Sequence, residues 1–495
     1  MTAQIDEETP LLSSEQPQTK KKPTPLPWFQ FSIVLFLQLA EPLTSQVIYP
    51  FAPQLIRDLG ITNGNESQVG YYVGLMQSIF FLTQAFTVLH WSRISDRVGR
   101  KPVILTGLLG LSISMYCFGL SRTFWGLVLS RSLNGALNGN IGVIKSMMAE
   151  MTDTTNISKA YAYMPIAWST GGTLGPIIGG SLARPAERFP HLFGQNEFLK
   201  KYPYFLPCAV PATFSLVAWI VTFLFLKETV RNPISPLQLL KIKKGKANGT
   251  LQNVVGSQDP SASSLPTVKS KNADLDEQEK PMPLRSLLTP RVVIAAANYA
   301  FLSLVDISFR AIQPLFFSTP IHLGGLGLPP STIGNILSVF GVLNGVFQVF
   351  FFAQIHDRWG SKKVFIAGIA SAFPVFLSFP VINYLAKMEG LTTRVWAVVA
   401  FQIVISIMLS LSYGAIFIFI SAASPNRASL GATNGLSQMT VSVMRAIGPA
   451  AANSLFSLSI DKGYLGGHLV YYVLLGVVAV SMVVASMLPR HIWTN

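Results

Sequence analysis

Six ionisable side chains lie inside long apolar stretches of the sequence. The acids are Glu41 and Asp306, and the bases are Arg131, Lys145, Arg310 and Arg445. An ionisable group in an apolar medium is costly, so each of the six is a candidate for a functional role. Burial favours the protonated form of a carboxyl group and can bring proton exchange into the physiological range. We therefore expect Glu41, which precedes Pro42 in the middle of its stretch, to carry a proton or to recognise a cation.

Each of these charges also has a structural interpretation. Glu41 can form a fixed ion pair with Arg131 or Lys145. Asp306 and Arg310 are four residues apart, which is one helical turn, so they can pair with each other instead of lining a cavity. Arg445 can face an anionic group of a ligand or pair with an acid on another helix. The candidates for proton coupling are therefore Glu41, Arg131 and Asp306. The candidates for lining a ligand cavity are Gln38, Lys145, Arg310 and Arg445.

Composition places these charges in a membrane. Of the 495 residues 50% are hydrophobic and 12% are charged, against about 25% charged in an average soluble protein. The net charge of +15 comes from short basic runs between uncharged stretches, which is the membrane pattern and not that of a nucleic-acid-binding face. The two cysteines form no disulfide framework, and neither zinc-ligand spacing nor a GxxxxGK[ST] phosphate loop occurs. We therefore expect no metal, no cofactor, no nucleic-acid partner and no enzymatic activity.

The apolar stretches predict an all-α membrane protein. A helix needs about 20 apolar residues to cross a bilayer, and a membrane β-barrel would need short alternating segments instead. The expected spans are 28–56, 68–91, 102–121, 124–148, 160–183, 204–226, 292–321, 332–355, 364–386, 395–422, 430–460 and 468–488.

The basic residues predict the orientation of these twelve helices. Most of the 37 Lys and Arg residues fall in segments that share the side of the N-terminus, so both termini are expected to be cytosolic. Asn65 then heads a glycosylation sequon on the opposite side, whereas the sequons at Asn156 and Asn248 face the cytosol. Polar composition predicts disorder in the N-terminus and the central linker. The expected divisions are 1–27 (N-terminus), 28–226 (six-helix half), 227–290 (linker), 291–489 (six-helix half) and 490–495 (tail).

The two halves repeat a loop motif. Asp96-Arg97-Val98-Gly99-Arg100-Lys101 follows the second span, and Asp357-Arg358-Trp359-Gly360-Ser361-Lys362 follows the eighth. Gly175-Pro176 in the fifth span likewise matches Gly448-Pro449 in the eleventh. Two six-helix halves are a secondary-transporter architecture. With these motifs the sequence resembles the major facilitator superfamily over nearly its whole length, although Ser92 stands where the loop signature begins with glycine.

The resemblance assigns roles to the motifs. It implies that Asp96 caps a neighbouring helix and that the basic residues form ion pairs, so that both loops act as a conformational latch. Arg131 with Gly135 resembles an element whose arginine is tied to proton coupling. A glycine-rich run resembles the signature of drug:proton antiporters, and it consists of Gly171, Gly175, Pro176, Gly179 and Gly180. Close helix packing without any consequence for transport is the alternative for this run.

Within these antiporters the sequence looks like the zinc-induced-facilitator-like group of fungi and plants. The matching segments are Ala40-Glu41-Pro42-Leu43, Tyr49-Pro50-Phe51, Tyr202 with Leu206-Pro207-Cys208, and Arg445-Ala446-Ile447-Gly448-Pro449-Ala450. The name of the group carries no zinc site to this chain, because no His, Cys and Asp cluster has ligand spacing.

The sequence therefore predicts a proton-coupled secondary transporter that moves small organic molecules by alternating access. Efflux or vacuolar sequestration of drugs or secondary metabolites by antiport is the first interpretation. Proton symport or uniport for nutrient uptake is the alternative, and a transporter-like receptor without flux is a further one. Glu7 with Leu11-Leu12 resembles an acidic dileucine sorting signal for vacuoles and lysosomes, and the vacuolar membrane and the plasma membrane both stay open as locations. Its partners are the lipid bilayer, protons and the substrate, and the fold would be complete as a monomer.

Overall fold

The computed structural model describes residues 24–152, 156–230, 286–425, 430–490 and 493, and within these ranges the regular structure is helical. Helices are what a chain in lipid must form, because their backbone groups bond internally. Several expectations fall outside the described residues: the dileucine motif, Asn248, and most of the terminal segments and of the linker.

The first group of helices covers the expected spans up to residue 226. The helices are α1 (Trp28–Gln38), α2 (Ala40–Gln46), α3 (Ala52–Asp58), α4 (Val69–Val98), α5 (Arg100–Leu120), α6 (Phe124–Leu137), α7 (Asn140–Met151), α8 (Ile157–Leu182) and α12 (Phe205–Phe225). Between α8 and α12 lie three short helices, namely α9 (Pro185–Arg188), α10 (Pro190–Phe193) and α11 (Glu197–Lys201). The short 3-10 helix η1 (Glu66–Gln68) precedes α4.

The second group covers the remaining spans. Its helices are α15 (Pro290–Ser318), α16 (Pro330–Phe350), α17 (Phe352–Trp359), α18 (Ser361–Ala370), α19 (Ala372–Glu389), α20 (Thr393–Ala423), α21 (Leu430–Lys462) and α22 (Leu469–Ser486). Two short 3-10 helices, η2 (Ile321–Leu323) and η4 (Tyr464–Gly467), join them on one side of the molecule.

Each expected span contains one helix or a run of successive helices. The first is divided into α1, α2 and α3, in a segment that carries Pro42, Pro50 and Pro53, because proline removes backbone donors and bends helices. Of the helices described, seven are long and apolar enough to cross a membrane on their own, or eight if a bent pair counts as one span. A multi-pass helical membrane protein is thus confirmed, and the number twelve stays a prediction.

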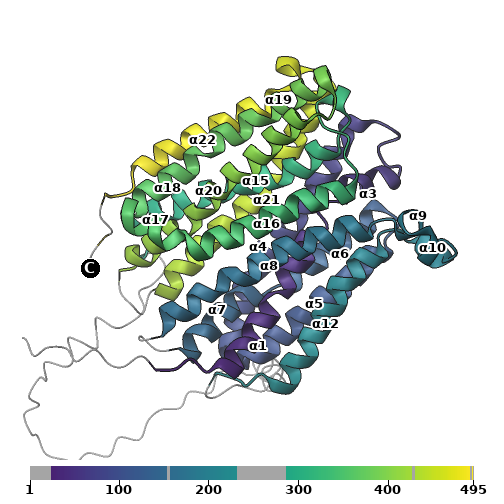
Figure 1. Cartoon of the computed structure of the whole chain (residues 1–495). Helices are drawn as coiled ribbons and strands as arrows, with labels where there is room; N and C mark the ends of the chain where they lie inside the picture. Colours follow the sequence, from purple (N-terminus) through teal and green to yellow (C-terminus); the bar gives the residue numbers. More distant parts are fainter. Residues whose placement is uncertain (1–23, 153–155, 231–285, 426–429, 491–492, 494–495) are drawn as a thin grey trace, which may run out of the picture.

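The two groups lie side by side, the purple-to-teal helices on one side and the green-to-yellow helices on the other (Figure 1). At the interface α8 packs along α16, and α4 packs along α21. One continuous core of buried side chains includes residues of both groups, such as Phe51, Met76 and Phe316. A second core, which includes Ile104 and Met147, belongs to the first group alone.

Contacts between the groups gather in the middle of the molecule and on the predicted non-cytosolic side. Arg57 at the end of α3 donates to Ser318 at the end of α15, with Nη1 2.5 Å from Oγ and Nη2 3.0 Å from O. Ser67 Oγ lies 3.2 Å from Asp461 Oδ1. Nearer the middle, the Ala450 N–H donates to Ser78 Oγ at 2.8 Å. In the described residues the two groups are therefore in contact on the predicted non-cytosolic side.

Candidate functional site

The central feature of the molecule is the carboxylate of Glu41, which lies between the two groups of helices. Glu41 is the second residue of α2 and is 9% exposed. Lys145 of α7 and Arg445 of α21 are close enough to attract it electrostatically. The amides of Gln84 and Asn138 lie beside it as well. The structure thus brings Glu41 together with one base from its own group and one from the other.

Arg445 connects Glu41 to a second charged cluster. Its Nε donates to Ser303 Oγ of α15 at 3.2 Å, and its guanidinium lies near Tyr299, Tyr413 and Asp306. Because α15, α20 and α21 each contribute a polar side chain here, the site is built from three helices of the second group.

The second cluster is the pair of Asp306 and Arg310. Arg310 Nε lies 2.9 Å from Asp306 Oδ1 and 3.0 Å from Oδ2, so the structure contains the helical-turn pair that the sequence offered as one interpretation. Tyr413 Oη donates to Asp306 Oδ2 at 2.9 Å, and the Arg310 guanidinium lies 5.1 Å from the centre of the Phe340 ring. Both carboxylate oxygens of Asp306 therefore accept hydrogen bonds from side chains of the same group of helices.

Arg131 does not join Glu41. It lies on α6, is 5% exposed, and stacks over the ring of Phe80 at 4.7 Å. Its titratable neighbours are Tyr49 and Cys208, and with Gln77 it lines a small cavity of 10 Å³. Tyr49 is close enough to interact electrostatically with Arg131 and also with Asp306, so Arg131 approaches the second cluster through Tyr49 and not through Glu41.

The sequence did not predict the aromatic wall beside these charges, which is formed by Tyr299, Tyr413 and Phe417. Tyr299 packs edge-on against Tyr413 at 6.1 Å and against Phe417 at 5.3 Å between ring centres. Lys145 Nζ lies 5.8 Å from the centre of the Phe417 ring, so this wall faces the first group. The spacing of Tyr299, Ser303, Asp306 and Arg310, with intervals of three and four residues, marks one helix face and is the signal that was available. Gln38, the remaining cavity candidate, is buried at the end of α1.

The antiporter-type glycines pack α8 against the helix that carries Glu41. A Cβ at Gly171 would lie 2.6 Å from Pro42 Cβ, and one at Gly175 would lie 2.8 Å from Gln46 Cβ. Gly179 approaches the backbone of Val47 in the same way. Gly180 faces the other group, where a Cβ would lie 3.0 Å from Gly334 Cα, and the carbonyl of Pro176 approaches Gly334. This run therefore joins α8 to α2 on one face and to α16 on the next.

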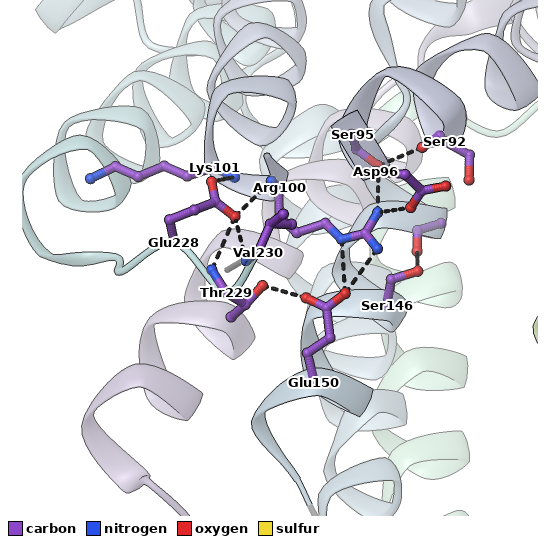
Figure 2. A network of polar contacts seen from close by, with 11 residues as sticks. Ser92, Ser95, Asp96, Arg100, Lys101, Ser146, Glu150, Glu228, Thr229 and Val230 are labelled. Atoms are coloured by element: carbon purple, nitrogen blue, oxygen red, sulfur yellow. Dashed lines mark hydrogen bonds and ion pairs between the residues drawn. The ribbon is translucent and has the colours of Figure 1, made fainter. Parts of the chain in front are cut away.

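The loop after α4 forms a network around Arg100 (Figure 2). Arg100 Nη1 lies 2.5 Å from Asp96 Oδ1, and Nη2 lies 2.8 Å from Glu150 Oε1. Glu228 caps α5, because its carboxylate accepts from the backbone N–H groups of Arg100 at 2.8 Å and Lys101 at 3.0 Å. In this conformation Glu228 caps α5 and Asp96 pairs with Arg100, and the capping of a neighbouring helix by Asp96 stays a prediction. The side chain of Arg97 is exposed.

The second copy of the loop keeps the backbone and changes the charges. Gly99 has φ 114° and Gly360 has φ 77°, a region that favours glycine. Ser361 replaces the arginine, and its Oγ lies 2.7 Å from His356 Nε2. The side chain of Asp357 is 82% exposed, and Arg358 is exposed too.

The lysines of the two loops are equivalent. Lys101 Nζ donates to Phe223 O, in the last turn of α12, at 2.8 Å. Lys362 Nζ donates to Ser486 O, at the end of α22, also at 2.8 Å. In both groups a basic side chain thus satisfies carbonyls at a helix C-terminus, where a positive charge is favourable.

Two further features concern modification and metals. Asn65 is exposed on the predicted non-cytosolic side and caps η1, because its Oδ1 accepts from Ser67 N at 3.0 Å. Within the described ranges no group of three or more His, Cys, Asp or Glu side chains is placed to hold a metal ion.

Comparison with known proteins gives matches over most of the chain. A family model described as Major Facilitator Superfamily matches residues 34–449. Protein ZINC INDUCED FACILITATOR-LIKE 1 of Arabidopsis thaliana is 30% identical over 477 residues, which cover 95% of this chain and 94% of that protein. Major facilitator-type transporter psiT2 of Psilocybe cyanescens is 29% identical over 471 residues, covering 92% and 89%.

A solved structure shares the fold. The human organic anion transporter MFSD10 (TETRAN) superposes with a TM-score of 0.59 at 18% identity, covering 93% of this chain and 100% of that one. The sequence matches and the shared fold together show that this chain belongs to the major facilitator superfamily of membrane transporters.

Proposed function

We propose that this protein is a proton-coupled secondary transporter of small organic molecules, and that Glu41 is its proton-binding group. The observation that carries the proposal is the buried Glu41 carboxylate between Lys145 of its own helix group and Arg445 of the other. An ionised Glu41 attracts Arg445 across the interface, and protonation removes that attraction. Proton binding and the relative position of the two groups are therefore coupled, which is what alternating access requires.

Antiport for efflux or vacuolar sequestration of drugs or secondary metabolites is the first form of this proposal. It is supported by the glycine run of α8, which resembles the antiporter signature and packs at Gly171 against Pro42, the residue after Glu41. A change in the backbone around Glu41 would thereby be passed to α8 and, through Gly180, to α16 of the other group.

Proton symport is the second form, and a different observation favours it. One carboxylate, Glu41, faces two bases, Lys145 and Arg445. An antiporter of cations is expected to offer its substrate an excess of acids, because substrate and proton then compete for the same carboxylates. The excess of bases supports binding of a substrate that does not compete with the proton.

The test uses purified protein in liposomes with an imposed pH gradient, while a dye reports the internal pH. A panel of organic cations, amino acids, carboxylates and aromatic drugs is added in turn. We expect a substrate to change the rate at which the gradient collapses with the wild type, and not with Glu41→Gln. Glu197→Gln is the matched control, because Glu197 makes an exposed pair with Lys200 on α11. Substrate flux without proton movement in the wild type, or coupling that survives in Glu41→Gln, would contradict the proposal.

A further inference from the structure

Arg131 of α6 is a buried cation, and none of the ion pairs among the described residues involves it. Its titratable neighbours are the phenol of Tyr49 and the thiol of Cys208, both of which are uncharged near neutral pH. The centre of the Phe80 ring lies 4.7 Å from the guanidinium carbon, and a ring attracts a cation without neutralising it. No acid within the described ranges thus compensates this charge, which is costly in an apolar medium.

Two buried donors belong to residues that line the small cavity beside this cation. Arg131 Nε has no hydrogen-bond partner in the described part of the chain, and the same holds for Gln77 Nε2. Both residues line the cavity of 10 Å³. The other end of the Gln77 amide, Oε1, accepts from Asn453 Nδ2 at 3.4 Å, so it is the donor end that lacks a partner. A buried donor without an acceptor costs free energy, and both donors therefore favour an acceptor at this cavity.

The lining of the cavity is rich in donors and free of acids. It consists of Ser45, Ile48, Tyr49, Met76, Gln77 and Arg131. The hydroxyl groups of Ser45 and Tyr49 can donate as well as accept, so four of the six side chains offer donors. A volume of 10 Å³ holds about one particle of the size of a water molecule, which excludes an organic substrate. Water would satisfy donors but bring no charge, whereas a monatomic anion accepts from the same donors and also compensates the guanidinium.

We propose that a halide ion, which is chloride under physiological conditions, binds in this cavity between the guanidinium of Arg131 and the amide of Gln77. The inference goes beyond the proposed function and does not depend on it, because Glu41 does not line the cavity. The unbranched side chain of Met76, which is fully buried, can adjust to the radius of the ion.

The position of the cavity connects the ion to the contact between the two groups of helices. Gln77 of α4 is oriented by Asn453 of α21, which belongs to the second group. Tyr49 lies near Asp306 and Arg310 of that group. If α4 and α21 separate, the Gln77 amide loses this contact and water reaches the guanidinium. The halide therefore prefers the conformation with the groups in contact and shifts the population toward it.

The first test is made on the wild type, so it does not depend on whether a variant folds. Sodium chloride replaces sodium gluconate stepwise at constant ionic strength, and the thermal unfolding midpoint of the full chain is measured in detergent. Gluconate is too large for the cavity. We expect the midpoint to rise and to level off, by about 2 °C when chloride exceeds its dissociation constant a hundredfold. A midpoint that does not respond to chloride, or a rise that never levels off, would overturn the proposal.

Variants then locate the site. Gln77→Glu places a carboxylate beside Arg131 and keeps the oxygen that accepts from Asn453, so it should be stable without chloride and show no chloride-dependent rise. Arg131→Gln removes the charge and should abolish the rise too. Arg394→Gln is the matched control and should keep it, because Arg394 pairs with Glu389 outside the spans and is 75% exposed. A rise that persists in either interior variant would place the halide elsewhere, and the proposal would fail.

Bromide identifies the bound particle directly. Crystals of the full chain grown in sodium bromide are measured at the bromine absorption edge, where bromide scatters anomalously and water does not. We expect an anomalous peak in the cavity, in contact with the guanidinium of Arg131 and the amide of Gln77. Electron density of a water molecule there without an anomalous peak would mean that the donors are satisfied by water alone, which contradicts a halide site.

Discussion

Gly171 of α8 packs directly against Pro42 of α2, the residue that follows Glu41. A Cβ at Gly171 would lie 2.6 Å from Pro42 Cβ and 2.9 Å from its carbonyl carbon. The neighbouring Gly172 has open space at the same point, with nothing within 4 Å. The two glycines therefore form a natural pair of test and control positions on one helix.

Gly171→Ala should displace α2 and destabilise the protein, whereas Gly172→Ala should be tolerated. Overpacking a close helix contact costs about 1–3 kcal/mol, and here the displaced residue adjoins Glu41. We expect a lower thermal unfolding midpoint and a loss of proton-coupled flux in Gly171→Ala alone. Equal thermal unfolding midpoints for the two variants would show that the close contact between Gly171 and Pro42 does not contribute to stability.

Replacing Asp306 or Arg310 alone should lower the free energy of unfolding far more than replacing both together. Asp306→Asn leaves the Arg310 guanidinium without its partner, and breaking a buried pair in this way costs about 3 kcal/mol or more. In the double variant Asp306→Asn with Arg310→Gln the charge of Arg310 is removed together with that of its partner. The measurement is a double-mutant cycle on the free energy of unfolding. Additive effects would show that the pair at 2.9 Å is not energetically coupled.

The helical membrane fold and the identity of the interior charged residues could be predicted from the sequence. The way in which these residues pair in the site could not. The uncharged stretches and the two DRxG-type loops were enough to predict a helical membrane protein of this superfamily, because the cost of polar groups in lipid restricts sequence strongly. Sequence alone could not say whether Glu41 faces Arg131 or Lys145, since that depends on the rotation of α6 and α7. The break between them at Asn138 and Gly139 sets this rotation, and no periodicity extends across it.

The same limit applies to the cap of α5, which the sequence did not predict. Glu228 lies 128 residues after Arg100, in the segment that the sequence assigned to a linker. Nothing in the spacing of charges pairs the two. The contact arises because α12 returns the chain to the start of α5, which only the packing of the helices reveals.

Arg100 should matter more than Arg97, although both belong to the same loop motif. Arg100 contacts Asp96, Glu150 and Ser95, whereas the side chain of Arg97 is exposed. Hydrogen bonds to charged groups contribute about 1.5–3 kcal/mol each when one partner is removed. We expect Arg100→Gln to lower the thermal unfolding midpoint clearly and Arg97→Gln to leave it nearly unchanged. The opposite order would contradict the network of Figure 2.

Arg57 should hold the non-cytosolic side closed. Its guanidinium joins Glu66 of its own group, at 2.8 Å, to Ser318 of the other group. Arg57→Gln should raise the population of the opened form about tenfold, the equivalent of one hydrogen bond to a charged group. Spin labels at Leu192 and Met388, both highly exposed, would report this as a shift to longer distances by double electron–electron resonance. The background replaces Cys117 and Cys208 by serine.

Arg394→Gln serves as the control for this experiment, because its pair with Glu389 stays within one group of helices. An unchanged distance distribution in Arg57→Gln would mean that other contacts, such as that of Ser67 with Asp461, are sufficient to keep this side closed.

The contacts of Lys101 and Lys362 have a mechanical consequence. Each lysine fastens an early loop of its group to the end of the last helix, Lys101 at Phe223 and Lys362 at Ser486. Both contacts lie within a group of helices and not across the interface. A relative movement of the two groups can therefore leave them intact, so that the change falls on the contacts between the groups.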